Sequence, residues 1–131
     1  MIRKLLYSFV IAATLFSCNN LAKKEPVTDI EVATTFIRAV LDNDFNTAEK
    51  YLLKDETNAQ YFERFRQNYQ AKSKSELEQY KASDIIVNNL QQVNDTTIVN
   101  YNNSYEKNIK TNLKLVRTNG HWLIDLKYTL Q

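Results

Sequence analysis

Apolar side chains recur at helical spacing from residue 33 onward. Five of them define one face of an amphipathic helix: Ala33, Phe36, Ile37, Val40 and Leu41. Before them, Thr28 and Glu31 have the spacing of a capping box, in which the two residues satisfy each other's free backbone donors. We expect this helix to end at Asn43-Asp44, because asparagine tolerates the left-handed conformation and aspartate caps a following helix.

Three further helical segments are predicted. The apolar stripe continues after Asp44 in four residues: Phe45, Ala48, Tyr51 and Leu52. A longer helix is expected over residues 57–72, with four aromatic side chains on its inner face: Tyr61, Phe62, Phe65 and Tyr69. Residues 75–81 predict a short helical piece, in which Leu77 and Tyr80 lie three positions apart.

After Ser83 the apolar period changes from helical to alternating. This change predicts four strands, at residues 84–93, 96–107, 109–118 and 121–130. Asn94-Asp95 and Asn119-Gly120 are turn signals, and the second is typical of a two-residue hairpin.

The Asn119-Gly120 turn fixes a register that sorts the side chains by face. Pairing Thr118 with His121 places Lys114 opposite Asp125, an opposite-charge pair on the outer face. The same register places Leu115 opposite Ile124 and Leu113 opposite Leu126. Five residues are therefore expected on the covered face of the sheet: Leu113, Leu115, Trp122, Ile124 and Leu126.

Helices followed by an antiparallel meander indicate an α+β domain, with N-terminal helices packed on a curved four-stranded antiparallel sheet. Its opening pattern is Phe36-x-x-Ala39-x-x-x-x-Asp44-x-x-x-Ala48-x-x-x-Leu52, and its closing pattern is Gly120-His121-Trp122-Leu123-Ile124. These patterns resemble the NTF2-like superfamily, and within it small bacterial lipoproteins with a DUF4878-type domain. The resemblance implies a cone with a pocket between the sheet and the helices, and in many relatives pairing through the sheet.

The N-terminus has a basic start, Met1-Ile2-Arg3-Lys4, followed by an uncharged stretch over residues 5–16. That stretch is too short for a membrane-spanning helix and is typical of a secretory signal. It closes with Leu15-Phe16-Ser17-Cys18, which resembles the lipobox of bacterial lipoproteins and implies cleavage before Cys18 and lipidation of that cysteine. An ordinary signal peptide, cleaved elsewhere, is the alternative. The predicted organisation is a signal peptide at 1–17, a lipidated cysteine and tether at 18–27, and an NTF2-like domain at 28–131.

The leader also accounts for the net charge of +2. Because two of the 17 basic residues lie in it, Arg3 and Lys4, the rest of the chain carries 15 basic and 15 acidic residues. A balanced domain without a basic stripe is not expected to bind nucleic acid. Asn19 follows the cysteine where an aspartate would, by resemblance, retain a lipoprotein in the inner membrane. We therefore expect an outer-membrane protein that faces the periplasm.

The polar residues do not assemble a catalytic or metal-binding motif. His121 is the only histidine, so no two-histidine metal site is available within one chain, and no cofactor is expected. Asp44 is explained as a helix cap, Asp84 as a solvated residue near a strand start, and Asp125 as the partner of Lys114. Cys18 is committed to lipid.

The aromatic residues are more suggestive of a site. Seven of them could line a cavity: Tyr61, Phe62, Phe65, Tyr69, Tyr101, Tyr105 and Trp122. Tyrosine has an apolar body and a polar tip, which suits a small apolar or amphipathic ligand. The alternative is that these residues simply fill the core. The polar alternates along residues 99–105 face solvent or form a wet surface for dimer contact.

These features lead to one expected function with two alternatives. The expected function is a non-catalytic ligand-binding or accessory role in the cell envelope, at the membrane through a lipid anchor. The first alternative is a small-molecule enzyme of the isomerase or hydratase kind, and the second is a structural subunit that forms a homodimer through its sheet.

Overall fold

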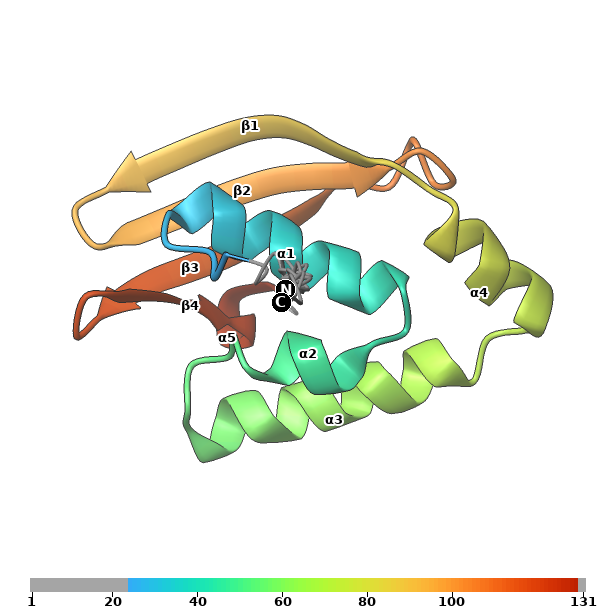
Figure 1. The fold of residues 1–131 in the computed structure, drawn as a ribbon, viewed down its shortest axis with the longest axis horizontal. Coiled ribbons are helices and arrows are strands. Elements are labelled where there is room, and N and C mark those ends of the chain that lie inside the picture. Colours follow the sequence, from blue (N-terminus) through green and yellow to red (C-terminus); the bar gives the residue numbers. More distant parts are fainter. Residues whose placement is uncertain (1–23, 130–131) are drawn as a thin grey trace, which may run out of the picture.

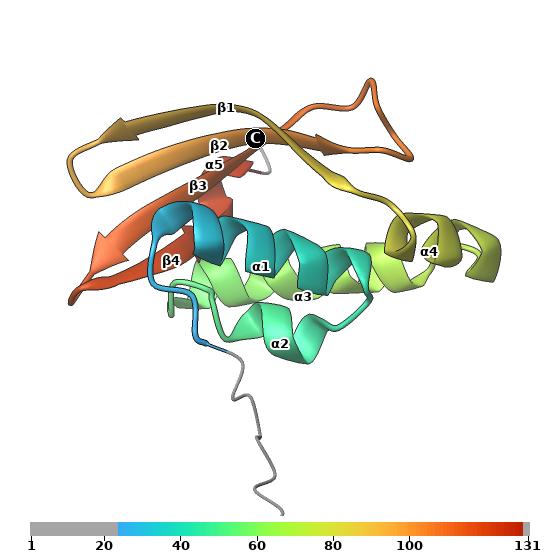
Figure 2. The same cartoon turned by 45° about the horizontal axis from the view of Figure 1, so that its top comes forward.

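The structure is a computed structural model that describes residues 24–129, so Cys18 and the predicted signal peptide lie outside the described residues. The helices α1 (Asp29–Leu41), α2 (Phe45–Glu49), α3 (Glu56–Gln70) and α4 (Lys74–Lys81) come first. The strands β1 (Ile85–Val93), β2 (Thr96–Asn103), β3 (Thr111–Thr118) and β4 (His121–Asp125) follow, and then a short helix, α5 (Leu126–Thr129). Helices α1, α2 and α3 lie on one side of the curved sheet (Figures 1 and 2), which confirms the α+β class.

The predicted boundaries of α1 are confirmed by its caps. The Thr28 hydroxyl accepts a hydrogen bond from the Glu31 N–H at 3.3 Å, and Glu31 Oε2 accepts one from the Thr28 N–H at 3.0 Å. At the other end, Asn43 adopts a φ of 59°, in the left-handed region that asparagine tolerates. Asp44 then caps α2 by accepting a hydrogen bond from the Thr47 N–H at 3.1 Å.

The sheet is an antiparallel meander with strand order β1-β2-β3-β4. Thr118 pairs with His121, and Lys114 pairs with Asp125, as the Asn119-Gly120 turn predicts. Asn119 and Gly120 both have positive φ, 52° and 78°, which is the geometry of the two-residue hairpin turn. The predicted register of β3 and β4 is therefore confirmed up to Asp125.

One hydrophobic core lies between the inner face of the sheet and the helices. The sheet contributes four residues that are at most 1% exposed, namely Val99, Leu113, Leu115 and Ile124. Ile37 on α1 and Phe62 on α3 are buried in the same core. Each fully buried side chain of this size stabilises the fold by about 2 kcal/mol. Burial of these side chains therefore contributes most of the free energy that holds the sheet and the helices together.

The two edges of the sheet differ. The edge of β4 is covered by the segment after α2, because the Ile124 N–H donates to Tyr51 O at 2.8 Å and the Leu53 N–H donates to Ile124 O at 2.9 Å. Among residues 24–129, strand β1 pairs only with β2, with a register shift between Val87 and Asn89, and it is exposed along nearly all of its length. The free edge of the sheet is therefore β1.

Strand β2 ends four residues earlier than the alternating pattern predicts. The prediction of a strand over residues 96–107 is wrong after Asn103, because the Asn103 side chain accepts hydrogen bonds from the backbone N–H groups of Tyr105 and Glu106 at 3.0 and 2.8 Å. These bonds turn the chain away from the sheet. Strand β3 correspondingly starts at Thr111 rather than at residue 109.

The last strand is also shorter than predicted. It ends at Asp125, and Leu126 starts α5 instead of pairing with Leu113. The Leu126 N–H donates to Asn58 Oδ1 at 2.7 Å, and the Lys127 N–H donates to Asp125 Oδ1 at 3.2 Å, so side chains take the place of the strand partner. Leu126 is nevertheless buried, as the register predicts for that residue.

Candidate ligand-binding site

A cavity of about 230 Å³ lies between the C-terminal half of α1, the end of α3, α4 and the strands β2 and β3. We call it the aromatic cavity. The helical part of the chain contributes Ile37, Val40, Leu41, Phe65, Tyr69, Lys72 and Tyr80 to its lining. The strands β2 and β3 and the loop between them contribute Tyr101, Asn102, Asn103, Glu106, Ile109 and Thr111. The predicted pocket between sheet and helices thus has a counterpart in the structure.

One wall of the aromatic cavity is a series of packed rings. Phe65 and Tyr69 on α3 lie 6.2 Å apart between ring centroids, and Tyr69 lies 5.3 Å from Tyr80 on α4. Tyr80 in turn contacts Tyr105 in the loop after β2, at 5.1 Å and nearly perpendicular. The first and last of these contacts are edge-to-face and the middle one is tilted, at 45°, so each ring is packed against the next in a favourable geometry.

The three tyrosines of the cavity stay protonated at neutral pH. Burial raises the pKa of Tyr69 to about 12, and its hydroxyl donates to Leu41 O at 3.3 Å. Burial also raises the pKa of Tyr101 to about 12, and the hydrogen bond with Thr111 offsets this only in part. The pKa of Tyr80 is raised by burial first and by its hydrogen bond to Glu106 second. These phenols serve as neutral hydrogen-bonding groups, not as bases.

Polar and charged groups are gathered at one side of the aromatic cavity. The Lys72 ammonium lies 5.3 Å from the centroid of the Tyr80 ring. Glu106 is half-buried and interacts with the hydroxyl of the same tyrosine. Asn103 holds the backbone of Tyr105 and Glu106 in place, so it positions this side of the cavity. The cavity is therefore amphipathic, with an apolar body and a polar end.

The seven aromatic candidates are distributed over several places. Phe65, Tyr69 and Tyr101 line the aromatic cavity. Phe62 lies in the core against Phe45, at 5.6 Å between centroids, and Tyr61 packs at the core's margin. Tyr105 is 43% exposed and supports the cavity from outside through Tyr80. The last candidate, Trp122, lines a different hollow.

The hollow beside Trp122 has a volume of about 450 Å³ and includes residues 25–27, which precede α1. His121 and Tyr51 also line it, and the Tyr51 hydroxyl donates to Glu25 Oε2 at 3.5 Å. Burial and, second, the charge of Glu25 raise the pKa of Tyr51. His121 is exposed at the hairpin end, which agrees with its interpretation as a surface residue.

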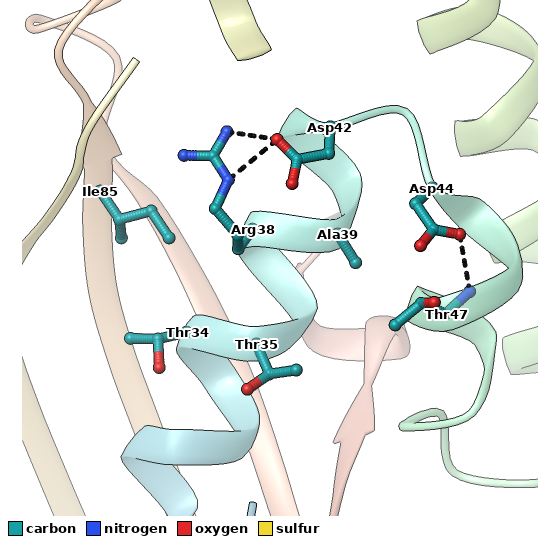
Figure 3. Close-up of a pocket in the computed structure, with 8 residues that line it drawn as sticks. All are labelled: Thr34, Thr35, Arg38, Ala39, Asp42, Asp44, Thr47 and Ile85. Carbon is teal, nitrogen blue, oxygen red and sulfur yellow. Dashed lines mark hydrogen bonds and ion pairs between the residues drawn. The ribbon is translucent and has the colours of Figure 1, made fainter. Parts of the chain in front are cut away.

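A polar groove of about 320 Å³ lies between α1, α2 and the start of β1 (Figure 3). The basic side chain that lines it, Arg38, forms hydrogen bonds with other residues of the protein. Arg38 Nε donates to Asp42 Oδ1 at 3.1 Å, and its Nη1 and Nη2 donate to Ser83 O and Lys81 O at 2.7 and 3.0 Å. Arg38 therefore holds the C-terminal end of α4 against α1, and we assign the groove a structural role.

Asp125 differs from its expected role as a simple outer-face partner of Lys114. The ion pair exists, at 3.6 Å, but Asp125 is only 6% exposed and also accepts a hydrogen bond from Asn58 Nδ2 at 3.3 Å. Lys127 Nζ lies 3.6 Å from the same carboxylate. Through its hydrogen bond with Asn58, this buried carboxylate joins α3 to the end of β4. It does not line the aromatic cavity.

The outer face of the sheet carries hydrogen-bonded asparagines. Asn88 Nδ2 donates to Asn100 Oδ1 at 3.2 Å and to Asn102 Oδ1 at 2.8 Å, and Asn100 Nδ2 donates to Asn112 Oδ1 at 2.7 Å. The asparagines of β2 are thus joined to asparagines of β1 and β3. These hydrogen bonds add to the backbone pairing of the sheet.

Most lining residues of the aromatic cavity were not among the predicted pocket residues, and three of these carry its polar chemistry: Tyr80, Asn103 and Glu106. A signal existed for Asn103, because it follows Val99 and Tyr101 in the same alternation and therefore shares their inner face. Tyr80 was expected on a short helix, but its distance from Tyr69 depends on tertiary packing. No pattern in the sequence indicates that the loop after β2 brings Glu106 back to the cavity.

Within residues 24–129, no cluster of histidine, cysteine, aspartate and glutamate has the form of a metal site. In the same described range, no helix combines the length and apolarity needed to cross a bilayer. Comparisons with protein-family models, with curated proteins and with solved structures gave no match for this chain.

Proposed function

We propose that this protein is a lipid-anchored component of a bacterial cell envelope whose domain binds a small apolar or amphipathic molecule without catalysis. The observation that carries the proposal is the aromatic cavity, with rings on one wall and polar groups at one end. Small-molecule sites are concave, mostly apolar and oriented by a few polar groups, and this cavity has those properties.

The proposed anchor rests on the leader and on Cys18. The motif Leu15-Phe16-Ser17-Cys18 after a short apolar stretch supports lipidation at Cys18 and an outer-membrane location that faces the periplasm. Two or more acyl chains suffice for stable anchoring, so the domain itself needs no membrane-binding face.

We further propose that the domain is of the NTF2-like, DUF4878 type. The arrangement of α1 and α3 across one face of a curved antiparallel sheet supports this assignment (Figure 2). The position of the aromatic cavity, enclosed by those helices and by β2 and β3, supports it as well.

Binding is favoured over the isomerase or hydratase alternative by the chemistry of the cavity. The lining groups with raised pKa values are Tyr69, Tyr80 and Tyr101, which burial keeps protonated. A general base for proton abstraction needs a group such as a carboxylate or histidine poised near neutral pH. Among the described lining residues the one carboxylate is Glu106, which already accepts a hydrogen bond from the Tyr80 hydroxyl. The buried carboxylate of Asp125 lies outside the cavity lining and is used at the junction with α3.

Native mass spectrometry of the protein isolated from its own envelope tests the proposal. We expect a small molecule to remain bound to the wild-type protein and to be lost from the Val40→Phe variant, whose larger side chain occupies the cavity. Val93→Phe is the matched control, because Val93 is 70% exposed at the β1–β2 turn. Absence of any bound small molecule in the wild type would contradict the proposal.

The location is tested by membrane fractionation of the Cys18→Ser variant. We expect this variant to leave the membrane fraction, whereas the wild type stays in it. Unchanged membrane association would contradict the lipid anchor.

The edge strand β1 favours a second candidate role, self-association. Its nine residues contain no charge, and four apolar side chains are 38–70% exposed: Ile86, Val87, Leu90 and Val93. Proteins usually protect free edges with charges or coverage, and antiparallel pairing of β1 with β1 of a second copy brings no like charges together. Light scattering after size-exclusion chromatography tests this. We expect the wild type to be a dimer, which Leu90→Lys dissociates and Asn112→Lys leaves intact. A monomeric wild type would contradict this role.

A further inference from the structure

The aromatic cavity contains a buried polar group whose hydrogen-bonding capacity is only partly used. Asn103 on β2 is 9% exposed and lines the cavity. Its Oδ1 accepts two backbone hydrogen bonds, from Tyr105 at 3.0 Å and from Glu106 at 2.8 Å. Because both partners are donors, they determine which end of the carboxamide is the oxygen. The NH₂ group, Nδ2, is therefore fixed at the other end.

Among residues 24–129, Nδ2 of Asn103 has no hydrogen-bond acceptor, although its neighbours do. Asn102 Nδ2 donates to Asn103 O at 3.3 Å, and the Tyr69 hydroxyl donates to Leu41 O at 3.3 Å. Buried donors are nearly always satisfied, by protein, by water or by a ligand. Because Asn103 lines the cavity, its unused donor is available to an acceptor atom of a bound molecule.

The charges at the polar end favour a neutral partner. Lys72 and Glu106 both line the cavity and carry opposite charges, so the lining has no net charge. A ligand with a net charge loses hydration on entry, and its attraction to one of these groups is offset by repulsion from the other. A neutral acceptor, such as a carbonyl or hydroxyl oxygen, loses less hydration free energy and still accepts a hydrogen bond from Asn103.

The volume limits the size of the ligand. A cavity of about 150 Å³ accommodates benzene, which has six non-hydrogen atoms. By proportion, the 230 Å³ of the aromatic cavity correspond to about nine such atoms. This is the size of one ring with a short substituent.

We propose that the aromatic cavity selects a small neutral molecule with a ring or branched apolar body and one oxygen that accepts a hydrogen bond from Nδ2 of Asn103. This inference rests on the proposed function, because it requires that the cavity binds a ligand. It adds the class of the ligand and the residue that recognises the ligand's polar end.

The variant Asn103→Asp separates recognition from structure. Aspartate keeps the oxygen that holds the backbone of Tyr105 and Glu106, but it replaces the donor by a second acceptor. Asn112→Asp is the matched control: Asn112 is exposed on β3, outside the cavity lining, and its Oδ1 accepts from Asn100 Nδ2 at 2.7 Å. Both variants introduce the same charge and retain an acceptor.

Three probes are titrated by ¹H–¹⁵N NMR into the chain from residue 18 onward that carries Cys18→Ser. Toluene has no acceptor, phenylacetone has a neutral carbonyl, and phenylacetate has the same size but a negative charge. We expect phenylacetone to bind the wild type more tightly than phenylacetate does. Asn103→Asp should lower the affinity for phenylacetone by about tenfold and change the affinity for toluene by less than about twofold. Asn112→Asp should change neither affinity.

A second measurement does not depend on the variant folding. Phenylacetone should shift the side-chain NH₂ signals of Asn103 in the wild type far more than toluene does, because it alone accepts a hydrogen bond. Binding of toluene and phenylacetone with unperturbed Asn103 NH₂ signals, or with equal affinity for Asn103→Asp, would overturn the inference but leave the proposed function standing. Tighter binding of phenylacetate than of phenylacetone would overturn the inference that the ligand is neutral. Failure of all three probes to bind would count against the proposed function itself.

Discussion

The side-chain oxygen of Asn58 accepts a hydrogen bond from the backbone N–H of Leu126 at 2.7 Å, across 68 positions of the chain. The same carboxamide donates to Asp125 Oδ1 at 3.3 Å and to Asp55 Oδ2 at 2.9 Å. Asn58 therefore joins the start of α3 to the point where β4 ends and α5 begins. A fully buried amide in this position ties together two elements that are remote in the sequence.

We expect Asn58→Ala to destabilise the protein by about 3 kcal/mol, because it leaves the buried Leu126 N–H without its acceptor and removes one hydrogen bond from the buried Asp125 carboxylate. Urea unfolding at pH 7 measures the free energy of unfolding. Asn89→Ala, at an exposed position of β1, serves as the control and should change stability by less than about 0.5 kcal/mol. Equal effects of the two substitutions would contradict the assigned role of Asn58.

The pH dependence of stability should contain a contribution from Asp55. A hydrogen bond from Lys127 and, second, one from the Asn58 N–H lower the pKa of Asp55 to about 2. Since this is below the ordinary aspartate pKa of 3.8, the contribution is complete above about pH 4 and is lost as the pH falls through about 2. The gap in unfolding free energy between wild type and Asp55→Asn should therefore shrink between pH 4 and pH 2.

The control for this prediction is the same comparison in a Lys127→Met background. Removing Lys127 takes away the first cause of the lowered pKa but leaves the hydrogen bond from the Asn58 N–H, so the gap should be smaller at pH 7 and should change less with pH than in the wild-type background. A gap between wild type and Asp55→Asn that stays constant from pH 7 to pH 2 would argue against the assignment.

Asn119 occupies the left-handed region with a φ of 52°, which most residues with a Cβ adopt only at a cost. We expect Asn119→Ala to destabilise the protein by about 1 kcal/mol, and Asn119→Gly to be nearly neutral because glycine adopts this conformation freely. Thermal or urea unfolding of the two variants provides the comparison. The prediction fails if alanine and glycine have the same effect.

Arg38 should control the attachment of α4. Arg38→Met removes the donors to Ser83 O and Lys81 O, and we expect a loss of about 1–2 kcal/mol. Hydrogen exchange should accelerate in α4 more than in α3. Arg66→Met removes only an exposed ion pair with Glu63 within α3 and should have little effect, so similar exchange in both variants would contradict the assignment.

Local signals in the sequence predict much of the fold. Thr28 and Glu31 define the start of α1, Asn43 and Asp44 separate α1 from α2, and Asn119-Gly120 sets the register of β3 and β4. Each of these signals acts over a few residues, through a cap or a turn. The chain has a single glycine, and three asparagines take the other positive-φ positions of the described residues: Asn43, Asn94 and Asn119.

The two errors in strand length have different causes. Strand β2 ends early because the Asn103 side chain binds the backbone two and three residues further on, whereas β4 ends early because of a distant side chain. Alternation predicts that β4 continues past Asp125, but Asn58 reaches from α3 and takes the Leu126 N–H. The site shows the same limit. Phe65, Tyr69 and Tyr101 were expected to line a pocket, whereas the contribution of Glu106 depends on the path of the loop after β2.

A xenon derivative shows whether the aromatic cavity is open to a small apolar molecule. Crystals of the chain from residue 18 onward with Cys18→Ser are pressurised with xenon, which enters apolar cavities. We expect anomalous density among Phe65, Tyr69 and Tyr101, and loss of that density in Val40→Phe. A wild-type crystal whose side chains fill this space, with no xenon among them, would contradict this expectation.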